Sequence, residues 1–404
     1  MNRVVITGFG IISSIGNNKK EVFNSLYNGK SGITFSNQMK NIGMRSNVCG
    51  NIQVDVKYLK KNRIFRFMND SAIYSFLSME QAIQDANLKK KYYKKNPRIG
   101  LIFGFGGGSS KYHINGIDSI RSLRGLKAVS PYIAIQSMPS NISGCLASIF
   151  QVYGVNYSIS SACATSAHCI GNAFELIQFG KQDLIFAGGG EEISWELAYQ
   201  FDAMRALSSQ FNHNPIKASR VYDINRDGFV ISGGGGVLVL ENLNSALSRS
   251  AHIYAEIIGY SATSDGANMI SPSGEGAFRC MNIAKNNLNI DYLNPHGTST
   301  KVGDLIELEA IKKVFYNTKK KPIISATKSI SGHALGASGV HEIIYILIML
   351  QNDFIAPTIN IDHLELLAKD MNIACKRIKK KITTAMSNSF GFGGTNVSLV
   401  LKKY

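Results

Sequence analysis

A cysteine at a predicted strand-to-helix junction is the first residue that could perform chemistry. Cys163 follows a predicted strand at 155–161 and precedes a predicted helix at 164–179, in the segment SISSACATSAHCIG. A thiol there feels the positive end of the helix dipole, which favours the nucleophilic thiolate. Its small neighbours would admit a substrate to the sulfur. The alternative is a buried inert thiol, which is what we expect for Cys169 inside the helix.

Two histidines lie in turns of small polar residues and could assist such a thiol. His296 lies in NPHGTSTKVGD, and His333 lies in ATKSISGHALGASG, five residues after Lys328. A nucleophilic thiol needs a base or an electrostatic partner. His168 is a poor candidate, because five helical residues place it about 140° around the helix from Cys163. Each histidine alone is more often structural, but two such turns together with the cysteine favour an enzyme.

A glycine-rich segment near the C-terminus, SNSFGFGGTN at 387–396, is predicted to be a loop between strands at 383–387 and 396–401. Its glycines permit tight turns that leave backbone N–H groups free to bind an oxyanion. Phe390 and Phe392 could instead fill the core, and the apolar character of their side chains alone favours that interpretation.

Several nucleotide-binding and hydrolase motifs are missing. The segments GFGIIS (8–13) and GFGGGS (104–109) end in serine where a dinucleotide fingerprint needs a third glycine, and there is no GxxxxGK[ST] or GxSxG. Hydride and phosphoryl transfer therefore become less probable functions. The glycines at 233–236 are expected to let a strand pack against another backbone.

Strands and helices alternate along the chain, which predicts an α/β fold with a largely parallel sheet. The segment 253–266 is similar to the opening segment 3–16, so the second half looks like a repeat of the first, with a boundary near 250. The remaining predicted strands cover 3–7, 99–103, 184–187 and 322–326, and a further helix covers 71–86.

Composition describes an ordinary globular protein with a large core. The chain has 404 residues, 45% hydrophobic and 18% charged, which predicts two or three domains and excludes global disorder. The formal charge of +17 indicates either an acidic partner or compositional drift under A/T-biased coding.

The N-terminus and the cysteines predict a cytoplasmic location. The opening residues resemble a strand rather than a signal peptide. The longest apolar stretch, 343–350, is too short to span a bilayer. Six cysteines without a CxxC pair argue against a disulfide scaffold and a tetra-thiolate zinc site.

Four segments in register resemble the β-ketoacyl-[acyl-carrier-protein] synthases: SACATSAH, NPHGTST, ATKSISGHALGASG and SNSFGFGGTN. The likeness runs from Val4 to Lys402 and is greatest with the type I synthases of bacterial fatty acid elongation. It implies a duplicated thiolase-like fold, five-layered αβαβα with two mixed sheets, and a homodimer. The half at 1–250 would contain the nucleophile, and the half at 251–404 the histidine, lysine and oxyanion-hole loops.

The resemblance also implies roles for individual residues. Cys163 matches the acyl-accepting nucleophile, His296 and His333 the active-site histidines, and Lys328 the lysine that supports His333. The backbone N–H groups of Cys163 and Phe392 match the oxyanion hole, and Phe392 also matches a gate. Thr298 and Thr300 match the hydroxyls that hold pantetheine, and Glu307 matches a buried structural acid. The acyl pocket is matched by Gly107, Met138 and Phe390. Pro295 stands where the family often has serine or alanine.

The implied reaction is a decarboxylative Claisen condensation of malonyl-carrier protein with an acyl group held on Cys163. It needs no metal or organic cofactor, although the resemblance also suggests a monovalent cation near Glu342, Ser387 and Asn388. The partner is an acyl-carrier protein, which is acidic and would explain part of the charge. The basic residues that match its docking positions are Arg45, Arg63, Arg66, Arg124 and Lys127.

Three alternatives remain. The chain could be a type II ketoacyl synthase with a different acyl pocket, or a catalytically silent partner that sets chain length. The second predicts a missing nucleophile or histidine, and both are present. A basic nucleic-acid-binding protein would need clustered charge with exposed aromatic residues, and KKKYYKK at 89–95 is the only such cluster. We therefore expect no nucleic-acid or membrane partner, and we attribute the lysine runs at 89–95, 319–321 and 379–381 to drift.

Overall fold

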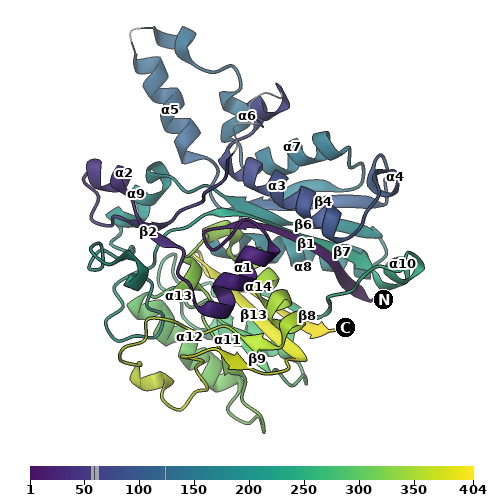
Figure 1. The fold of residues 1–404 in the computed structure, drawn as a ribbon, viewed down its shortest axis with the longest axis vertical. Coiled ribbons are helices and arrows are strands. Elements are labelled where there is room, and N and C mark those ends of the chain that lie inside the picture. The colour runs from purple at the N-terminus through teal and green to yellow at the C-terminus, as the bar shows by residue number, and fades with distance from the viewer. Residues whose placement is uncertain (56–58, 60–62, 123) are drawn as a thin grey trace.

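The computed structural model describes residues 1–55, 59, 63–122 and 124–404 (Figure 1). Within this part of the chain, ten strands form one hydrogen-bonded sheet with the order β10-β9-β13-β14-β8-β1-β7-β6-β4-β5. The N-terminal five are β1 (Val4–Ser13), β4 (Ile99–Phe105), β5 (Asn156–Ile159), β6 (Leu184–Glu191) and β7 (Gly234–Asn242). The C-terminal five are β8 (Ala255–Ser264), β9 (Tyr292–Asn294), β10 (Ile323–Ile324), β13 (Thr384–Gly391) and β14 (Thr395–Lys403).

The two sets of five strands have the same topology. If the five strands of each set are numbered along the chain, their order across the sheet is first, fifth, fourth, second, third in both sets. The second strand pairs in parallel with the third and fourth, while the fifth pairs antiparallel with the first and fourth. This repeat confirms the predicted duplication. The sheets are not fully separate, because Val5 pairs with Glu256 and Ile6 with Ala255 where β1 meets β8.

Helices cover both sheets and fill the space between them, which gives the predicted five layers (Figure 1). The outer layers are α3 (Asp70–Asp85) with α7 (Asn141–Phe150), and α11 (Glu275–Lys285) with α12 (Lys301–Val314). The middle layer is α8 (Thr165–Gln178) with α14 (Ser338–Asn352). Residues Ser338 to Leu350 of α14 are all buried. The apolar stretch at 343–350 is therefore part of the protein core.

Smaller elements complete the chain. Two small two-stranded antiparallel sheets pair β2 (Ile33–Phe35) with β3 (Val48–Gly50), and β11 (Phe354–Ile355) with β12 (Ile378–Lys379). The remaining helices are α1 (Lys19–Asn28), α2 (Asn37–Asn41), α4 (Lys90–Tyr93), α5 (Ser110–Arg121), α6 (Ile133–Ser137), α9 (Trp195–Ala203), α10 (Leu243–Ser248) and α13 (Lys328–Ser331). Helix α5 projects from the body (Figure 1). No helix in the described ranges has the length and apolarity needed to cross a membrane.

Glycines extend β1 beyond its predicted end and let β7 pack against a helix. β1 continues through Gly8 and Gly10 to Ser13, because α3 packs directly on this backbone. A Cβ at Gly10 would lie 1.9 Å from the carbonyl oxygen of Ser78. Gly235 of the run at 233–236 approaches α3 in the same way, since a Cβ there would lie 2.7 Å from the Ser75 nitrogen, and a Cβ at Gly234 would lie 2.2 Å from the Ile12 carbonyl oxygen. The close backbone approach predicted for them is confirmed.

The predicted C-terminal loop at 387–396 is largely wrong. β13 extends through Gly391 and β14 begins at Thr395, so only three residues form the turn. Ser387 and Asn388 are buried within β13. The high content of small residues reflects close packing there, because a Cβ at Gly391 would lie 2.8 Å from the Ser161 carbonyl oxygen.

Candidate active site

Cys163 lies between the two sheets at the point where β5 leads into α8. It occupies a single 3₁₀ turn, Ala162–Ala164, and is buried. Ala162 has φ +49°, a left-handed conformation that costs energy for any residue with a Cβ. Such strain next to a buried thiol is typical of functional turns. Cys169, one turn into α8, is fully buried in the central core as expected.

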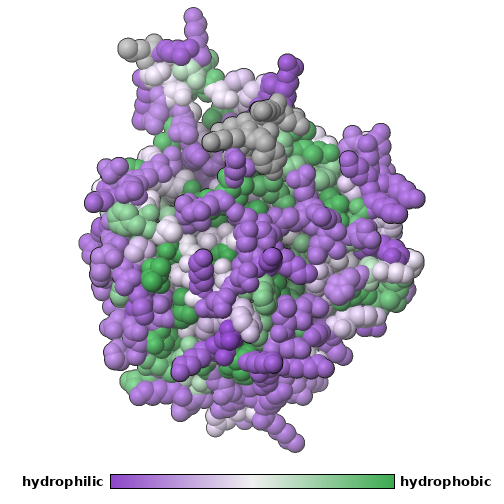
Figure 2. All heavy atoms as spheres, in the orientation of Figure 1, coloured by the Kyte–Doolittle hydropathy of each residue, from purple (hydrophilic) through white to green (hydrophobic). Residues whose placement is uncertain are grey.

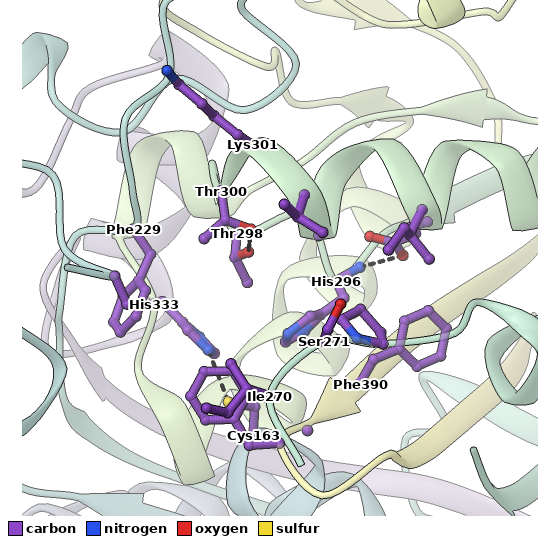
Figure 3. A pocket seen from close by; sticks show the side chains of 18 of the residues that line it. Cys163, Phe229, Ile270, Ser271, His296, Thr298, Thr300, Lys301, His333 and Phe390 are labelled. Atoms are coloured by element: carbon purple, nitrogen blue, oxygen red, sulfur yellow. Dashed lines mark hydrogen bonds between the residues drawn. The ribbon is translucent and has the colours of Figure 1, made fainter. Parts of the chain in front are cut away.

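His333 is the nearest side chain to the thiol. Its Nε2 lies 3.1 Å from Cys163 Sγ, and its Nδ1 lies 2.9 Å from the Ser338 hydroxyl at the start of α14 (Figure 3). The sequence separates Cys163 and His333 by 170 residues, and the stacked sheets bring them together. His168 instead bonds to Ser161, with 2.8 Å between Nδ1 and the hydroxyl, and so does not serve the thiol.

His296 lies beside His333 and completes a group of three. Its ring centroid is 5.2 Å from that of His333, with the ring planes at 83°. The turn after β9 holds it in place, because the backbone N–H groups of His296 and Gly297 donate to the two carboxylate oxygens of Glu307, each at 2.7 Å. Glu307 is buried on α12. The carboxylate thus fixes the backbone that carries His296, with Pro295 accommodated in the turn.

Lys328 supplies a buried positive charge behind the histidines. Its ammonium group pairs with the Glu342 carboxylate on α14, and both side chains are almost fully buried. Burial first, and the Lys328 charge second, lower the pKa of His296 and of His333 well below the usual histidine value. Both imidazoles are therefore neutral at physiological pH, so each ring has one N–H that can donate and one nitrogen that can accept a proton.

The thiol itself does not match the expectation of a resting thiolate. Burial raises the pKa of Cys163 to about 12, although the charge of Lys328 and the backbone N–H groups of Phe392 and Cys163 lower it. Desolvation outweighs these stabilising contacts because the Cys163 thiol is buried. The resting group is a thiol in contact with a neutral imidazole, and it becomes a nucleophile only when its proton leaves.

The same two N–H groups, of Phe392 and Cys163, are the pair predicted to bind an oxyanion, and both lie against the Cys163 sulfur. Phe392 lies at the tip of the β13–β14 hairpin, where Gly393 and Gly394 have φ +83° and +74°. The Gly393 N–H donates to the Met269 carbonyl at 2.8 Å, which ties the tip to a neighbouring loop. The Phe392 side chain is 39% exposed. The N–H pair thus lies next to the nucleophile, behind an accessible aromatic ring.

A cavity of about 400 Å³ opens onto this group (Figure 3). Cys163, His296 and His333 line it, and so do Thr298 and Thr300, whose hydroxyl oxygens lie 3.1 Å apart. Most of the remaining lining is apolar, as is usual for a small-molecule site. The two hydroxyls are thus polar groups in the same cavity wall as the thiol.

The sequence did not point to several residues of this cavity. Phe201, Phe229 and the segment 268–272 line it, and Asp265 links that segment to the hairpin through a 2.8 Å bond from Asn396. The segment belongs to the connection 265–274 between β8 and α11, which is rich in Ser, Asn, Gly and Pro. Such a run is a signal for a functional loop, but the two phenylalanines carry no local signal.

Not every predicted site residue lies in the cavity. Phe390 lines it, with its ring 6.0 Å from that of His296, whereas Gly107 and Met138 do not line it and are exposed in the single chain. The predicted docking residues are exposed on the surface, outside the cavity lining. They are Arg45, Arg63, Arg66, Arg124 and Lys127.

A second group of buried polar side chains lies beside Lys328. Glu342 Oε2 and the Ser387 hydroxyl are buried and have no hydrogen-bond partner among the described residues. Burial raises the pKa of Glu342 to about 7. Asn388 is already engaged, since its Oδ1 accepts from Ser398 at 2.9 Å. The two unpaired oxygens suit a hard monovalent cation, so Glu342 and Ser387 fit the expected ion better than Asn388 does.

Family comparisons cover both halves of the chain. Residues 1–246 match the family model described as "Beta-ketoacyl synthase, N-terminal domain", and residues 254–362 match "Beta-ketoacyl synthase, C-terminal domain". The chain is 73% identical over its full length to "3-oxoacyl-[acyl-carrier-protein] synthase 1" of Buchnera aphidicola subsp. Schizaphis graminum, with all of both chains covered. It is 60% identical to the protein of that name in Escherichia coli K12, covering 100% of this chain and 99% of the relative.

Solved structures agree with these matches. A β-ketoacyl synthase from Burkholderia phymatum superposes with a TM-score of 0.93 at 30% identity, with all of both chains covered. A type II polyketide ketosynthase, solved in complex with its acyl-carrier protein, superposes with a TM-score of 0.90 at 27% identity, covering 100% of this chain and 99% of that one. The chain belongs to the β-ketoacyl synthase family.

Proposed function

We propose that this protein is a type I 3-oxoacyl-[acyl-carrier-protein] synthase, which extends acyl chains by two carbons in fatty acid synthesis. The observation that carries the proposal is the contact between Cys163 Sγ and His333 Nε2 at 3.1 Å, with His296 beside it. The full-length relatives that are 56–73% identical to this chain carry the name 3-oxoacyl-[acyl-carrier-protein] synthase 1. Relatives named 3-oxoacyl-[acyl-carrier-protein] synthase 2 are 34–35% identical to it. This difference favours type I over type II.

The first half-reaction transfers an acyl group to Cys163. The thiol proton moves to His333 Nε2, and the sulfur attacks the thioester carbonyl of an acyl-carrier protein. The N–H groups of Cys163 and Phe392 bind the resulting oxyanion. Collapse breaks the carrier's C–S bond, and the carrier thiol takes the proton from His333. Thr298 and Thr300 hold the pantetheine arm during this step.

The second half-reaction condenses a malonyl unit with the bound acyl group. The neutral imidazoles of His296 and His333, the latter with its ring proton now on Nε2 and with Nδ1 accepting from Ser338, donate hydrogen bonds to the malonyl thioester oxygen, which stabilises the enolate left when CO₂ departs. The enolate carbon attacks the acyl thioester, a C–C bond forms and the C–S bond to Cys163 breaks, and the departing Cys163 thiolate takes up a proton from solvent. Burial, with the charge of Lys328 as a second cause, keeps both imidazoles neutral. No organic cofactor takes part in these steps.

Mass spectrometry after incubation with acyl-carrier protein tests this assignment. The wild-type chain should gain one acyl group on Cys163, and Cys163→Ala should gain none. Cys375→Ala is the matched control, because Cys375 is exposed and should leave the adduct unchanged. An adduct that persists in Cys163→Ala would contradict the proposal.

The acyl chain would extend from Cys163 past Phe390 towards Gly107 and Met138. A Cβ at Gly107 would meet no atom within 4 Å, so space for a chain exists there in the single protomer. A condensation assay over acyl-carrier substrates of different length and unsaturation tests this pocket. Equal rates for every length would argue against a restricted type I pocket.

We also propose a homodimer formed through the β5 edge. β5 is the last strand of the sheet, and Tyr153 and Tyr157 beside it are exposed. Apolar residues of the projection, Ile120 and Leu126 among them, are more than half exposed, and apolar surface continues beside α6 and α7 (Figure 2). A second copy would cover these residues and close the acyl pocket. Light scattering should give about twice the chain mass of 44.1 kDa.

The acidic carrier protein would dock on the basic residues around the cavity. Arg66 already has a defined position, with its guanidinium 2.9 Å from the Tyr132 hydroxyl. Reversing the charge of Arg63 together with Arg66 should raise KM for carrier-bound substrates, and added salt should shrink the difference. An unchanged KM at low salt would refute this docking site.

The remaining assignments concern organisation and location. The chain divides functionally at 250/251, with Cys163 before the boundary and His296, Lys328 and His333 after it. A cytoplasmic location is supported by six free cysteines. A monovalent cation held by Glu342 and Ser387 would balance charge behind the histidines.

A further inference from the structure

The catalytic cluster contains three metal-ligand atoms within a small volume. Cys163 Sγ and one ring nitrogen each of His296 and His333 all lie within 4.8 Å of one another. No other group of three or more His, Cys, Asp or Glu residues with such spacing occurs in the described part of the chain. One thiolate and two imidazoles are the donors that Zn²⁺ prefers.

We propose that this cluster is a reversible inhibitory site for Zn²⁺ and similar thiophilic divalent ions. Bond lengths of about 2.3 Å to sulfur and 2.0–2.1 Å to nitrogen place tetrahedral ligand atoms roughly 3.3–3.6 Å apart. The Sγ–Nε2 distance between Cys163 and His333 is already 3.1 Å. The longest of the three distances between these ligand atoms must shorten by about 1.3 Å, which rotation of the Cys163 and His296 side chains can supply.

Both histidines are prepared for this role by their surroundings. His333 Nδ1 is fixed by the Ser338 hydroxyl, so Nε2 is the nitrogen that faces the sulfur. This is the outer-shell contact that orients most metal-binding histidines. His296 Nδ1 is buried and has no hydrogen-bond partner, so the ring can turn without breaking a bond on that side. Three protein ligands leave a fourth position that opens into the cavity, where water completes the shell.

Electrostatics moderates the affinity. Metal binding displaces the Cys163 thiol proton to solvent and forms a sulfur–zinc bond, and both imidazoles are already neutral. The Lys328 ammonium repels a dication, but it is paired with Glu342, and Glu307 adds a second buried carboxyl group on the same side. We therefore expect a dissociation constant on the order of 1 μM, weaker than that of a four-ligand structural site.

Occupation of this site would block both half-reactions. The sulfur lone pair would be bound and unable to attack a thioester, and neither histidine nitrogen could donate to a malonyl oxygen. The inhibition should be reversed by a chelator. Mg²⁺ should not reproduce it, because hard cations prefer oxygen donors.

Titration of the whole protein with Co²⁺ tests the site without reference to activity. Wild type should develop thiolate-to-cobalt charge-transfer absorption at one equivalent, and Zn²⁺ should displace it. Cys163→Ser should abolish that absorption and weaken Zn²⁺ binding by roughly 100-fold, and His296→Ala should weaken it similarly. Cys375→Ser is the control and should bind as wild type does, because Cys375 is exposed and distant in sequence.

Alkylation of wild type supplies a measurement that needs no variant. Zn²⁺ should protect Cys163 from iodoacetamide, as read by peptide mass spectrometry, while Cys375 remains reactive. Absence of charge-transfer absorption, or equal alkylation of Cys163 with and without Zn²⁺, would overturn the proposal. Either result is independent of whether the protein condenses acyl chains, because neither readout uses a carrier substrate.

Discussion

At the residue scale, the chemistry depends on keeping ionisable groups neutral in a buried cluster. Cys163 is a thiol because burial raises its pKa to about 12, and the two histidines are neutral because burial and Lys328 lower theirs. A protonated imidazole could not accept the thiol proton. Lys328 therefore contributes by its charge and not by touching substrate, and it is a positioning and electrostatic residue.

Removing this charge should change the pH dependence of decarboxylation. In wild type, malonyl decarboxylation should persist below pH 6.5, because His296 and His333 stay neutral there. In the double variant Lys328→Gln, Glu342→Gln, which leaves no unpaired buried charge, the histidine pKa values rise and the acid limb should move up by roughly one pH unit. Lys20→Gln, an exposed lysine on α1, should leave the profile unchanged. Identical profiles for the double variant and wild type would contradict this role of Lys328.

At the scale of the elements, a buried arginine fixes the loop that carries Thr298 and Thr300. Arg226 is 1% exposed. It donates to the carbonyl oxygens of Thr300 and Lys301 at 3.0 and 2.9 Å, and pairs with Asp304 on α12. Asp304 in turn accepts from the Thr298 N–H at 3.1 Å. One ion pair thus holds both hydroxyls at the cavity wall.

Breaking that pair should cost stability and substrate affinity together. Arg226→Met leaves the Asp304 carboxyl group without its partner, which costs about 3–5 kcal/mol when both groups are buried. Denaturant unfolding should detect the loss, and KM for carrier-bound substrate should rise more than kcat falls. Arg279→Met, which removes an exposed pair with Glu275 on α11, is the control and should have little effect. Equal stability of the two variants would contradict the assignment.

The contact between α3 and β1 makes a second prediction at this scale. Gly10→Ala would place a Cβ 1.9 Å from the Ser78 carbonyl oxygen, so strand and helix must separate. We expect a loss of at least about 2 kcal/mol in the free energy of unfolding. Gly144→Ala in α7 meets no atom within 4 Å and should instead stabilise the helix by roughly 0.5–1 kcal/mol. A neutral Gly10→Ala would show that the close packing is unimportant.

At the scale of the whole molecule, a buried carboxyl group joins the two halves beside the active site. Glu191 ends β6, and its Oε2 accepts from the N–H groups of Gly106 and Gly336 at 3.2 and 3.1 Å. Gly336 belongs to the C-terminal half and lies three residues after His333. Burial raises the pKa of Glu191 to about 8, despite these two N–H groups. The protonated acid is therefore the form that the folded protein prefers.

This preference predicts how stability changes with pH. Between pH 4.5 and 8 the folded state binds a proton at Glu191 that the unfolded state has lost, so this residue makes stability fall as pH rises. Glu191→Gln should remove that contribution and raise the free energy of unfolding at pH 8 by on the order of 1 kcal/mol or more. Glu309→Gln, at an exposed position of α12, should not change the slope. Parallel pH curves for wild type and Glu191→Gln would contradict the prediction.

The fold followed from the sequence where local patterns were strong. The alternation of strands and helices and the similarity of 253–266 to 3–16 predicted a duplicated α/β fold, which the two identical strand orders confirm. Strand ends were less predictable. Gly8 and Gly10 suggest a turn when read locally, yet they continue β1 because α3 needs the space that side chains would fill. Close packing also explains why the predicted loop at 387–396 is mostly strand with a three-residue turn, because a side chain at Gly391 would collide with the Ser161 carbonyl oxygen.

By itself, the sequence determined which groups could react, because Cys163, His296, Lys328 and His333 stand in short polar turns that are visible along the chain. Only the tertiary structure decided their states and partners. It brings His333 to 3.1 Å from a thiol 170 residues away, and it buries that thiol so deeply that desolvation outweighs the helix terminus. Burial and distance between remote segments are properties of packed layers, and no local pattern encodes them.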